Sequence, residues 1–299
     1  MAEKLKLALN PNRTLAESMR TIAFDDVVEA VRLCCLAAAT HLPDDVLAAL
    51  REAHRKETKP VARELLRQCL ENADIACREN MPICQDTGFA VFFGEMGKML
   101  KRDRGTVSEA ITEGTRRGYR DGFLRKSIVK DPIFQRKNTQ DNTPPIIHLA
   151  IEPGDKLKVI LAPKGGGSEN MSALKMLKPS DGRAGVADFV VESVVKAGGN
   201  PCPPTIVGVG VGGTFEKAAF LAKKALLRRV GAVNPDPEYA ALEKEILDRI
   251  NASGVGAQGL GGDVTALAVH IENYPCHIAS LPVAVNLNCH AARHAGFEL

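Results

Sequence analysis

Tryptophan is absent from this chain, and aromatic residues make up only 4% of its 299 residues. The sequence therefore offers few of the aromatic platforms on which nucleic-acid bases stack. Net charge is also nearly absent, because 39 basic and 36 acidic residues leave a formal charge of +3. So small a charge provides no long-range field for holding a polyanion. We expect no nucleic-acid partner.

No apolar run reaches the roughly 20 residues that a membrane span needs. The first ten residues alternate charged and apolar side chains without the apolar core of a signal peptide. We therefore expect no membrane partner and a cytoplasmic protein. The eight cysteines are too sparse and too irregularly spaced for a secreted disulfide scaffold. In a reducing compartment they should be free thiols or metal ligands.

Hydrophobic residues make up 45% of the chain and charged residues 25%, as in ordinary folded proteins. From Phe24 to Asn80 apolar residues recur at helical intervals, which predicts three helices. Beyond Pro82, β-type runs alternate with helical ones; the first predicted strand is at 88–94 and the next predicted helix covers about 107–117. No repeat or flexible linker interrupts them. The sequence predicts a mixed α/β (α+β) fold in a single domain over residues 1–299. Its helical portion covers about 1–80, and mixed sheet layers with helices cover about 81–299.

Four segments bounded by glycine or proline carry polar residues that local structure does not require, and such loops commonly hold functional groups. The first runs from Cys84 to Gly88, with the sequence CQDTG. In one interpretation Asp86 only closes a turn and Gly88 supplies a positive φ. In the other, Cys84 is a thiolate ligand and Asp86 is an acid or base beside a metal. The residues alone leave both open.

The second segment, Lys164 to Asn170, has the sequence KGGGSEN. Three glycines without Cβ atoms let backbone N–H groups approach an anion closely, and Lys164 adds a positive charge. The segment has the spacing neither of a P-loop nor of G-x-G-x-x-G, which argues against a nucleotide. A flexible turn is the alternative.

The third segment places Cys202 between prolines that restrict its backbone, which suits a rigidly presented ligand or a buried thiol. The fourth is a C-terminal set with the pairs Cys276-His277 and Cys289-His290. None of the short spacings of structural zinc sites occurs there. The remaining cysteines lie in helical patterns and are predicted to be core or inert thiols: Cys34, Cys35, Cys69 and Cys77.

Taken in order, these segments resemble class I, iron–sulfur fumarate hydratases. The resemblance rests on CQDTG at 84–88, KGGGSEN at 164–170, NPCPP at 200–204 with the glycines of 208–213, and CHAAR at 289–293. It runs from the N-terminal helices nearly to the last residue. The chain is similar to the N-terminal domain, or the separate α subunit, of that family, which also includes L-tartrate dehydratase.

The resemblance implies a [4Fe-4S] cluster held by Cys84, Cys202 and Cys289, with the fourth iron open. Cys276 competes with Cys289 for the third position. Cys289 is preferred because the family's cysteine precedes a small, polar, arginine-containing stretch. Asp86 is then the catalytic acid or base acting on the substrate hydroxyl.

By the same resemblance the dicarboxylate substrate is contacted by four groups: Gln85, Arg125, Gly166 and His277. The motif around Arg125 is short, so Lys126 and Arg136 remain alternatives. The family residue that removes the C3 proton belongs to the C-terminal domain. The resemblance therefore implies a β subunit and a hetero-oligomer such as α2β2.

The expected activity is reversible hydration of fumarate to (S)-malate, a hydro-lyase reaction of the tricarboxylic acid cycle. Fumarate is preferred because residues 168–170 resemble the fumarase version of the glycine loop. Three alternatives stay open: an L(+)-tartrate dehydratase α subunit, a non-enzymatic iron–sulfur regulatory or binding module, and a mononuclear zinc hydrolase.

Overall fold

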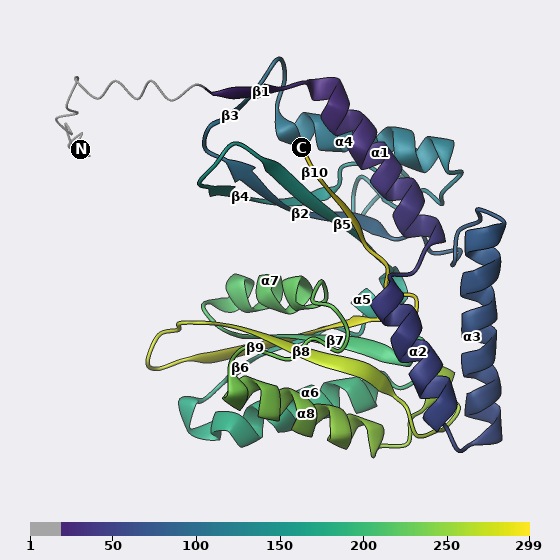
Figure 1. Ribbon diagram of the computed structural model, residues 1–299. Helices are drawn as coiled ribbons and strands as arrows, with labels where there is room; N and C mark the ends of the chain where they lie inside the picture. The colour runs from purple at the N-terminus through teal and green to yellow at the C-terminus, as the bar shows by residue number, and fades with distance from the viewer. Residues whose placement is uncertain (1–18) are drawn as a thin grey trace.

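Two four-stranded sheets organise the protein in the computed structural model, which describes residues 19–299. The sheets lie one above the other, each with its own helices, and two further helices run along one side (Figure 1). Each sheet has its own buried apolar cluster. The mixed α/β architecture predicted from the sequence is confirmed.

The first sheet has the strand order β10-β5-β2-β4. Its strands are β2 (Phe89–Gly97), β4 (Ile146–Glu152), β5 (Leu157–Lys164) and β10 (Ala295–Glu298). β2 pairs in parallel with β4 and antiparallel with β5, and β10 closes the edge beside β5. Two helices, α1 (Phe24–Thr40) and α4 (Val107–Asp121), pack against each other over this sheet. A small parallel pair, β1 (Arg20–Ile22) and β3 (Leu100–Arg102), lies at its end.

The second sheet has the order β6-β9-β7-β8 and a helix layer on each face. Its strands are β6 (Ala173–Leu177), β7 (Thr205–Gly212), β8 (Ala266–Tyr274) and β9 (Leu281–Asn288). α7 (Phe215–Ala225) covers one face, and α6 (Gly182–Ala197) and α8 (Pro237–Asn251) cover the other. Every residue of β7 is buried. Gly210 lets α7 approach closely, because a Cβ there would lie 2.0 Å from the carbonyl of Ala218.

The three predicted N-terminal helices exist, but they divide between the two sheets. α1 belongs to the core of the first sheet. α2 (Asp44–Lys56) and α3 (Pro60–Arg78) pack together beside the second sheet and bury a separate apolar cluster with it. Local sequence signals explain where two of the helices begin. α2 has Asp44 and Asp45 in its first turn, and α4 has a capping box between Thr106 and Glu109.

The stretch Phe24–Lys56, taken as one piece, is long and apolar enough to cross a membrane, because an 18-residue window within it has a mean hydropathy of 1.4. This differs from the expectation that no run reaches that length. In the fold the stretch is two helices separated by residues 41–43. Apolar residues of α1 such as Val27 and Val31 are buried against the protein's own core.

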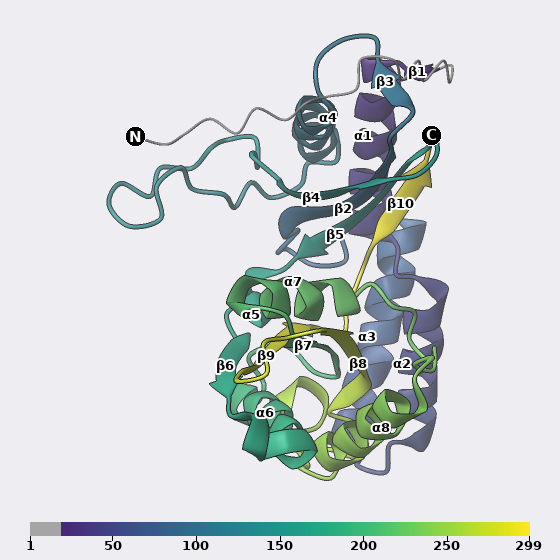
Figure 2. The same cartoon turned by 90° about the vertical axis from the view of Figure 1, so that its left-hand side faces the viewer.

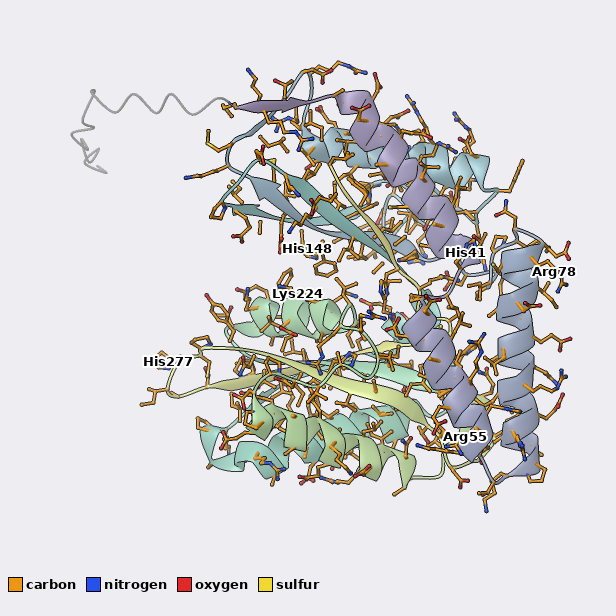
Figure 3. The ribbon with its side chains drawn as sticks, viewed as in Figure 1. His41, Arg55, Arg78, His148, Lys224 and His277 are labelled. Atoms are coloured by element: carbon orange, nitrogen blue, oxygen red, sulfur yellow. The ribbon has the colours of Figure 1, made fainter. Side chains whose placement is uncertain are left out.

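The space between the sheets includes a cavity of about 730 Å³ lined from both sides. The ring of His148 on β4 lies 5.0 Å from the rings of Phe93 and Phe220. Figure 3 shows His148 and Lys224 approaching this space from the first sheet and from α7. Two connections that join the first sheet to the second lie away from this cavity. One is at α5 (Gly166–Glu169), which follows β5, and the other leads from β9 to β10.

Candidate functional site

The Asp86 carboxylate lies at the junction between the two sheets. Its Oδ2 accepts a hydrogen bond from the backbone N–H of Gly166 at 2.7 Å, and its Oδ1 accepts one from Gly88 at 3.0 Å. A Cβ at Gly165 would lie only 3.3 Å from Oδ2, so the glycine loop can approach this carboxylate closely. Gly88 has a φ of 83°, as a turn requires. The turn interpretation of the CQDTG segment is thus observed, and Asp86 also contacts a second loop through Gly166, while its role beside a metal stays a prediction.

Cys84 belongs to the same turn and is partly exposed. Its Sγ accepts a hydrogen bond from the backbone N–H of Asp86 at 3.4 Å. The preceding residue, Ile83, is fixed on both sides: its N–H donates to the carbonyl of Ala39, and its carbonyl accepts from Asn72 Nδ2 at 2.9 Å. Two helices therefore hold the segment that presents the thiol.

Cys202 and Cys289 come from two different loops of the second sheet, and these loops contact each other. The carbonyl of Cys202 lies 3.0 Å from His290 Nδ1 and accepts from the His290 backbone N–H at 3.3 Å. Cys202 has a φ of 54°, a left-handed conformation that is uncommon for a residue with a side chain. The backbone at Cys202 is therefore strained and is held by the surrounding loop.

Cys84 lies near enough to the other two thiols to act on each of them electrostatically. Burial is the main cause that raises the pKa of Cys202, and the nearby Cys84 thiol raises it further. Burial also raises the pKa of Cys289, and Cys84 again adds to the effect. The three cysteines predicted as ligands are therefore neighbours, although more than 200 residues separate Cys84 from Cys289 in the sequence.

Cys69 on α3 joins this neighbourhood, and the sequence pattern did not indicate it. Burial raises the pKa of its thiol to about 11, and Cys289 and Cys202 contribute to the rise. Of the other cysteines predicted to be core or inert, Cys34 and Cys35 are buried and Cys77 is exposed. A helical position carries no local signal of a contact formed with two distant loops, so only the fold shows the position of Cys69.

Two buried cations adjoin the thiols. Lys164 is 5% exposed, and its Nζ donates to Ser168 Oγ at 2.7 Å. Burial lowers the pKa of this amine to about 8. Arg293 is also 5% exposed, and its Nη2 donates to the Asp86 carbonyl. Its Nε and Nη1 have no hydrogen-bond partner among residues 19–299, which leaves donors available for an anionic group.

These features fit the cluster that the resemblance implies. Three thiols from separate loops suit an iron–sulfur cluster, in which each thiolate binds a different iron. Three thiolates give such a cluster a net negative charge, and the side chains of Arg293 and Lys164 lie beside them to offset it. Within the described part of the chain, no three Cys, His, Asp or Glu side chains are grouped to hold a single metal ion.

Gln258 holds the two second-sheet loops together and is also absent from the sequence-based predictions. Its Nε2 lies 2.9 Å from the Pro203 carbonyl and 3.1 Å from His290 Nδ1. Its backbone N–H donates to the same Pro203 carbonyl at 2.8 Å. One amide side chain thus joins the loop of Cys202 to the residue after Cys289. The only sequence feature that could have drawn attention to Gln258 is its position in the glycine-rich run 254–262.

The structure places Arg125 at the edge of the site. Its side chain is exposed, and its carbonyl accepts a hydrogen bond from Thr87 Oγ1 at 3.0 Å. Of the two alternatives, Lys126 bonds through its carbonyl to Asn138, and Arg136 bonds to the Pro132 carbonyl farther along the same loop. Arg125 is therefore the candidate whose backbone touches the segment that carries Asp86. Gln85 is exposed beside Cys84.

His277 and Cys276 lie away from the three thiols and Asp86. Both are exposed in the turn between β8 and β9, where His277 Nδ1 accepts from the Ala279 backbone at 3.1 Å. Figure 3 shows His277 at the outer end of this hairpin, on the far side of the sheet from α5 in the same view of Figure 1. The chain by itself therefore brings Cys289, and not Cys276, beside Cys84 and Cys202, and it leaves His277 away from Asp86.

Comparisons with known proteins identify the family of the chain. A sequence model of the family described as "Fumarate hydratase (Fumerase)" matches residues 28–298. A Methanocaldococcus jannaschii protein named "Putative L(+)-tartrate dehydratase subunit alpha" is 45% identical over 277 residues, covering 91% of this chain and 95% of that protein. The Escherichia coli K12 "L(+)-tartrate dehydratase subunit alpha" is 32% identical over 284 residues, covering 93% and 92%. The chain belongs to the class I fumarate hydratase family of hydro-lyases, among relatives that are tartrate dehydratase α subunits.

Proposed function

We propose that this chain is the α subunit of an L(+)-tartrate dehydratase, a hydro-lyase that removes water from a 2-hydroxy dicarboxylate. The observation that carries the proposal is the Asp86 carboxylate, which lies beside three neighbouring thiols in a chain whose relatives carry that name. Loss of water from tartrate gives an enol, which tautomerises to oxaloacetate.

The choice of tartrate replaces the sequence-based preference for fumarate. That preference rested on residues 168–170, and Glu169 is the ionisable group among them. Its carboxylate accepts from Lys223 Nζ at 2.7 Å and from Asn286 Nδ2 at 2.9 Å. Glu169 is therefore engaged in holding the loop to Lys223 and Asn286, and this motif gives no reason to select fumarate. Fumarate hydration remains the second candidate because the family description names it.

In this proposal Cys84, Cys202 and Cys289 hold a [4Fe-4S] cluster. An iron without a protein thiolate supplies Lewis acidity toward the substrate hydroxyl when the cluster is bound. The chain's own part is to move the proton. Asp86 serves as acid or base at that hydroxyl, with its carboxylate oriented by the N–H groups of Gly166 and Gly88.

Binding of the dianionic substrate needs cations and donors at the same place. Arg125 lies at the edge of the site and can pair with a carboxylate through two parallel hydrogen bonds. Gln85 is exposed next to Cys84. The Gly166 N–H is engaged by Asp86 in this structure, so a substrate carboxylate at Gly166 would share or replace that bond. His277 would reach the substrate only from another copy of the chain or after a rearrangement.

A β subunit completes the site in this proposal, since the relatives are named as α subunits. It would supply the group that removes the proton from carbon, in a hetero-oligomer such as α2β2. The cytoplasm is the proposed compartment, because the thiols of the cluster site must stay reduced before the cluster binds.

The test is turnover by the complex purified anaerobically with its β subunit. We expect L(+)-tartrate to be dehydrated to oxaloacetate with a higher kcat/KM than (S)-malate is dehydrated to fumarate. Turnover of malate and fumarate with none of tartrate would establish the fumarase alternative instead. A complex that carries its cluster but turns over neither substrate would favour the non-enzymatic iron–sulfur module.

A further inference from the structure

The loop between α4 and β4 is the most protruding part of the described chain. We call residues 123–142 the arm. Figure 2 shows it extending from the body beside α4. Three of its large apolar side chains face solvent, since Phe123 is 91% exposed, Ile133 is 72% exposed and Phe134 is 86% exposed. Exposed apolar residues grouped on one projecting element mark an interaction surface.

The tip of the arm is held in shape by its own hydrogen bonds. The Asp131 carboxylate accepts from the backbone N–H groups of Ile133, Phe134 and Gln135 at 2.9, 3.1 and 3.2 Å. Below the tip, Val129 and Asn138 form a β-bridge. The arm therefore presents Ile133 and Phe134 in a fixed position without folding them onto the body, and a preorganised tip lowers the entropic cost of binding a partner.

The base of the arm is bonded to the site described above. Asn142 is fully buried; its Nδ2 donates to the Gly88 carbonyl at 3.2 Å and its Oδ1 accepts from Ser127 at 2.8 Å. Thr87 Oγ1 donates to the Arg125 carbonyl at 3.0 Å. Thr87 and Gly88 directly follow Asp86. A partner that binds the tip would therefore also restrict the base of the arm. The base carries Arg125 and is bonded to the residues next to the Asp86 carboxylate.

The charge of the arm indicates what kind of surface would bind it. The arm, residues 123–142, contains five basic residues and two acidic residues, in a chain that is otherwise nearly neutral. An acidic surface with an apolar pocket is the complement of such an arm, and opposite charge would speed its docking. The partner that the proposed reaction requires must also reach the open edge of the site, where the arm begins.

We propose that the arm is the docking element for the β subunit, with Ile133 and Phe134 entering an apolar pocket rimmed by acidic side chains. The identity of this partner rests on the proposed function. Docking at the tip would fix the arm and, through its base, the position of Arg125 beside Asp86. A second copy of this chain is the competing occupant, and the test separates the two.

The test uses the cluster-loaded chain, purified anaerobically, and the β subunit of the same organism immobilised by an affinity tag. The first variant is the double substitution Ile133→Ser with Phe134→Ser. The second is Lys130→Glu with Lys137→Glu. The control is Val233→Ser, an apolar residue that is 79% exposed outside the arm. Cluster absorbance and the far-UV circular dichroism of each variant verify folding, since all these side chains are exposed.

We expect the tip variant to weaken binding about tenfold or more, while the control binds as the unaltered chain does. The charge variant should slow association about tenfold at low salt and lose its acceleration at low ionic strength. Binding of the tip variant within about twofold of the unaltered chain would overturn the proposal. So would loss of self-association in sedimentation with β-subunit binding intact, because the tip would then hold a second copy.

Binding and turnover measurements distinguish an error in the docking site from an error in the proposed function. A complex that binds through the arm but dehydrates neither tartrate nor malate would refute the function and keep the docking site. A complex that is active and unaffected by the tip substitutions would refute the docking site and keep the function. An unaltered chain that binds no β subunit would overturn the docking assignment itself.

Discussion

Asp86 and Gly166 are joined by a hydrogen bond of 2.7 Å between a carboxylate oxygen and a backbone N–H, although 80 residues separate them in the sequence. This bond connects the turn before β2 to the start of α5, so it ties the cysteine-bearing segment to the glycine loop. A loop with side chains at 165 and 166 would meet the carboxylate, because Cβ atoms there would lie 3.3 and 3.7 Å from Oδ2. The backbone N–H groups of Gly88 and Gly166 thus fix the orientation of the Asp86 carboxylate at the place where the two loops meet.

Asp86→Asn should abolish turnover and leave the iron–sulfur centre in place. An amide of the same shape can keep the bond from the Gly88 N–H, but its NH2 group cannot accept the bond from the Gly166 N–H. The amide also cannot transfer the proton, and loss of such a group typically lowers kcat about 100-fold or more. Steady-state kinetics and visible absorbance of the same sample measure both effects. Asp25→Asn, at an exposed ion pair with Arg104, serves as the control. Turnover within about tenfold of the unaltered protein would remove Asp86 from its proposed role.

Gln258→Ala should shorten the lifetime of the bound cluster without unfolding the chain. The substitution removes the side-chain contacts to Pro203 and His290 and so frees the loops of Cys202 and Cys289 to separate. The bonds from His290 to the Cys202 carbonyl and from the Gln258 N–H to Pro203 remain, so the expected effect is a loosening of the loops. The readout is the decay of visible absorbance during exposure to a chelator under anaerobic conditions. Gln68→Ala is a matched control, because Gln68 bonds only to a neighbouring Glu64 on the surface of α3. Equal decay in both variants would show that Gln258 does not stabilise the site.

The free energy of unfolding should decrease as the pH falls from about 6.5 to about 4, with His270 as one cause. His270 is 2% exposed, and burial, with Arg228 nearby, lowers its pKa to about 4. Because the unfolded imidazole binds a proton near pH 6.5 and the folded one does not, acid favours unfolding across this window. The loss is roughly 3 kcal/mol at 1.36 kcal/mol for each pH unit.

Denaturant unfolding curves at pH 7 and pH 4.5 check this prediction. His270→Gln removes the titrating group while retaining a polar side chain toward the Ala225 carbonyl, which lies 3.2 Å from His270 Nδ1. We expect the variant to be less stable at pH 7 but to lose less stability on acidification. The same pH dependence in both proteins would assign the acid sensitivity to other groups.

The sequence predicted the elements well because local patterns govern them. The predicted helix over 107–117 begins at Val107 as observed, where the Thr106 capping box starts α4, although α4 continues to Asp121. The predicted strand at 88–94 is the first part of β2. Helical periodicity could not show that α1 and α2 serve different cores, since that division depends on how the two sheets stack.

The site itself was only partly accessible from the sequence. Cys84, Cys202 and Cys289 were selected through a family resemblance, and the fold makes them neighbours. Cys69 and Gln258 escaped notice because their contacts depend on long-range pairing of loops. His277 differs in the opposite way, since the resemblance assigns it to the substrate. The hairpin holds it at the outer end of the second sheet, away from α5, whose Gly166 bonds to Asp86 (Figures 1 and 3).

The most direct measurement is iron and acid-labile sulfide per chain, determined anaerobically for the unaltered protein and for four single cysteine-to-serine variants. We predict about four iron and four sulfide in the unaltered protein. Cys84→Ser, Cys202→Ser and Cys289→Ser should each lose most of both, while Cys276→Ser, at the exposed hairpin, should retain them. Loss in Cys276→Ser with retention in Cys289→Ser, or about one zinc and no sulfide in the unaltered protein, would contradict the three-cysteine cluster site.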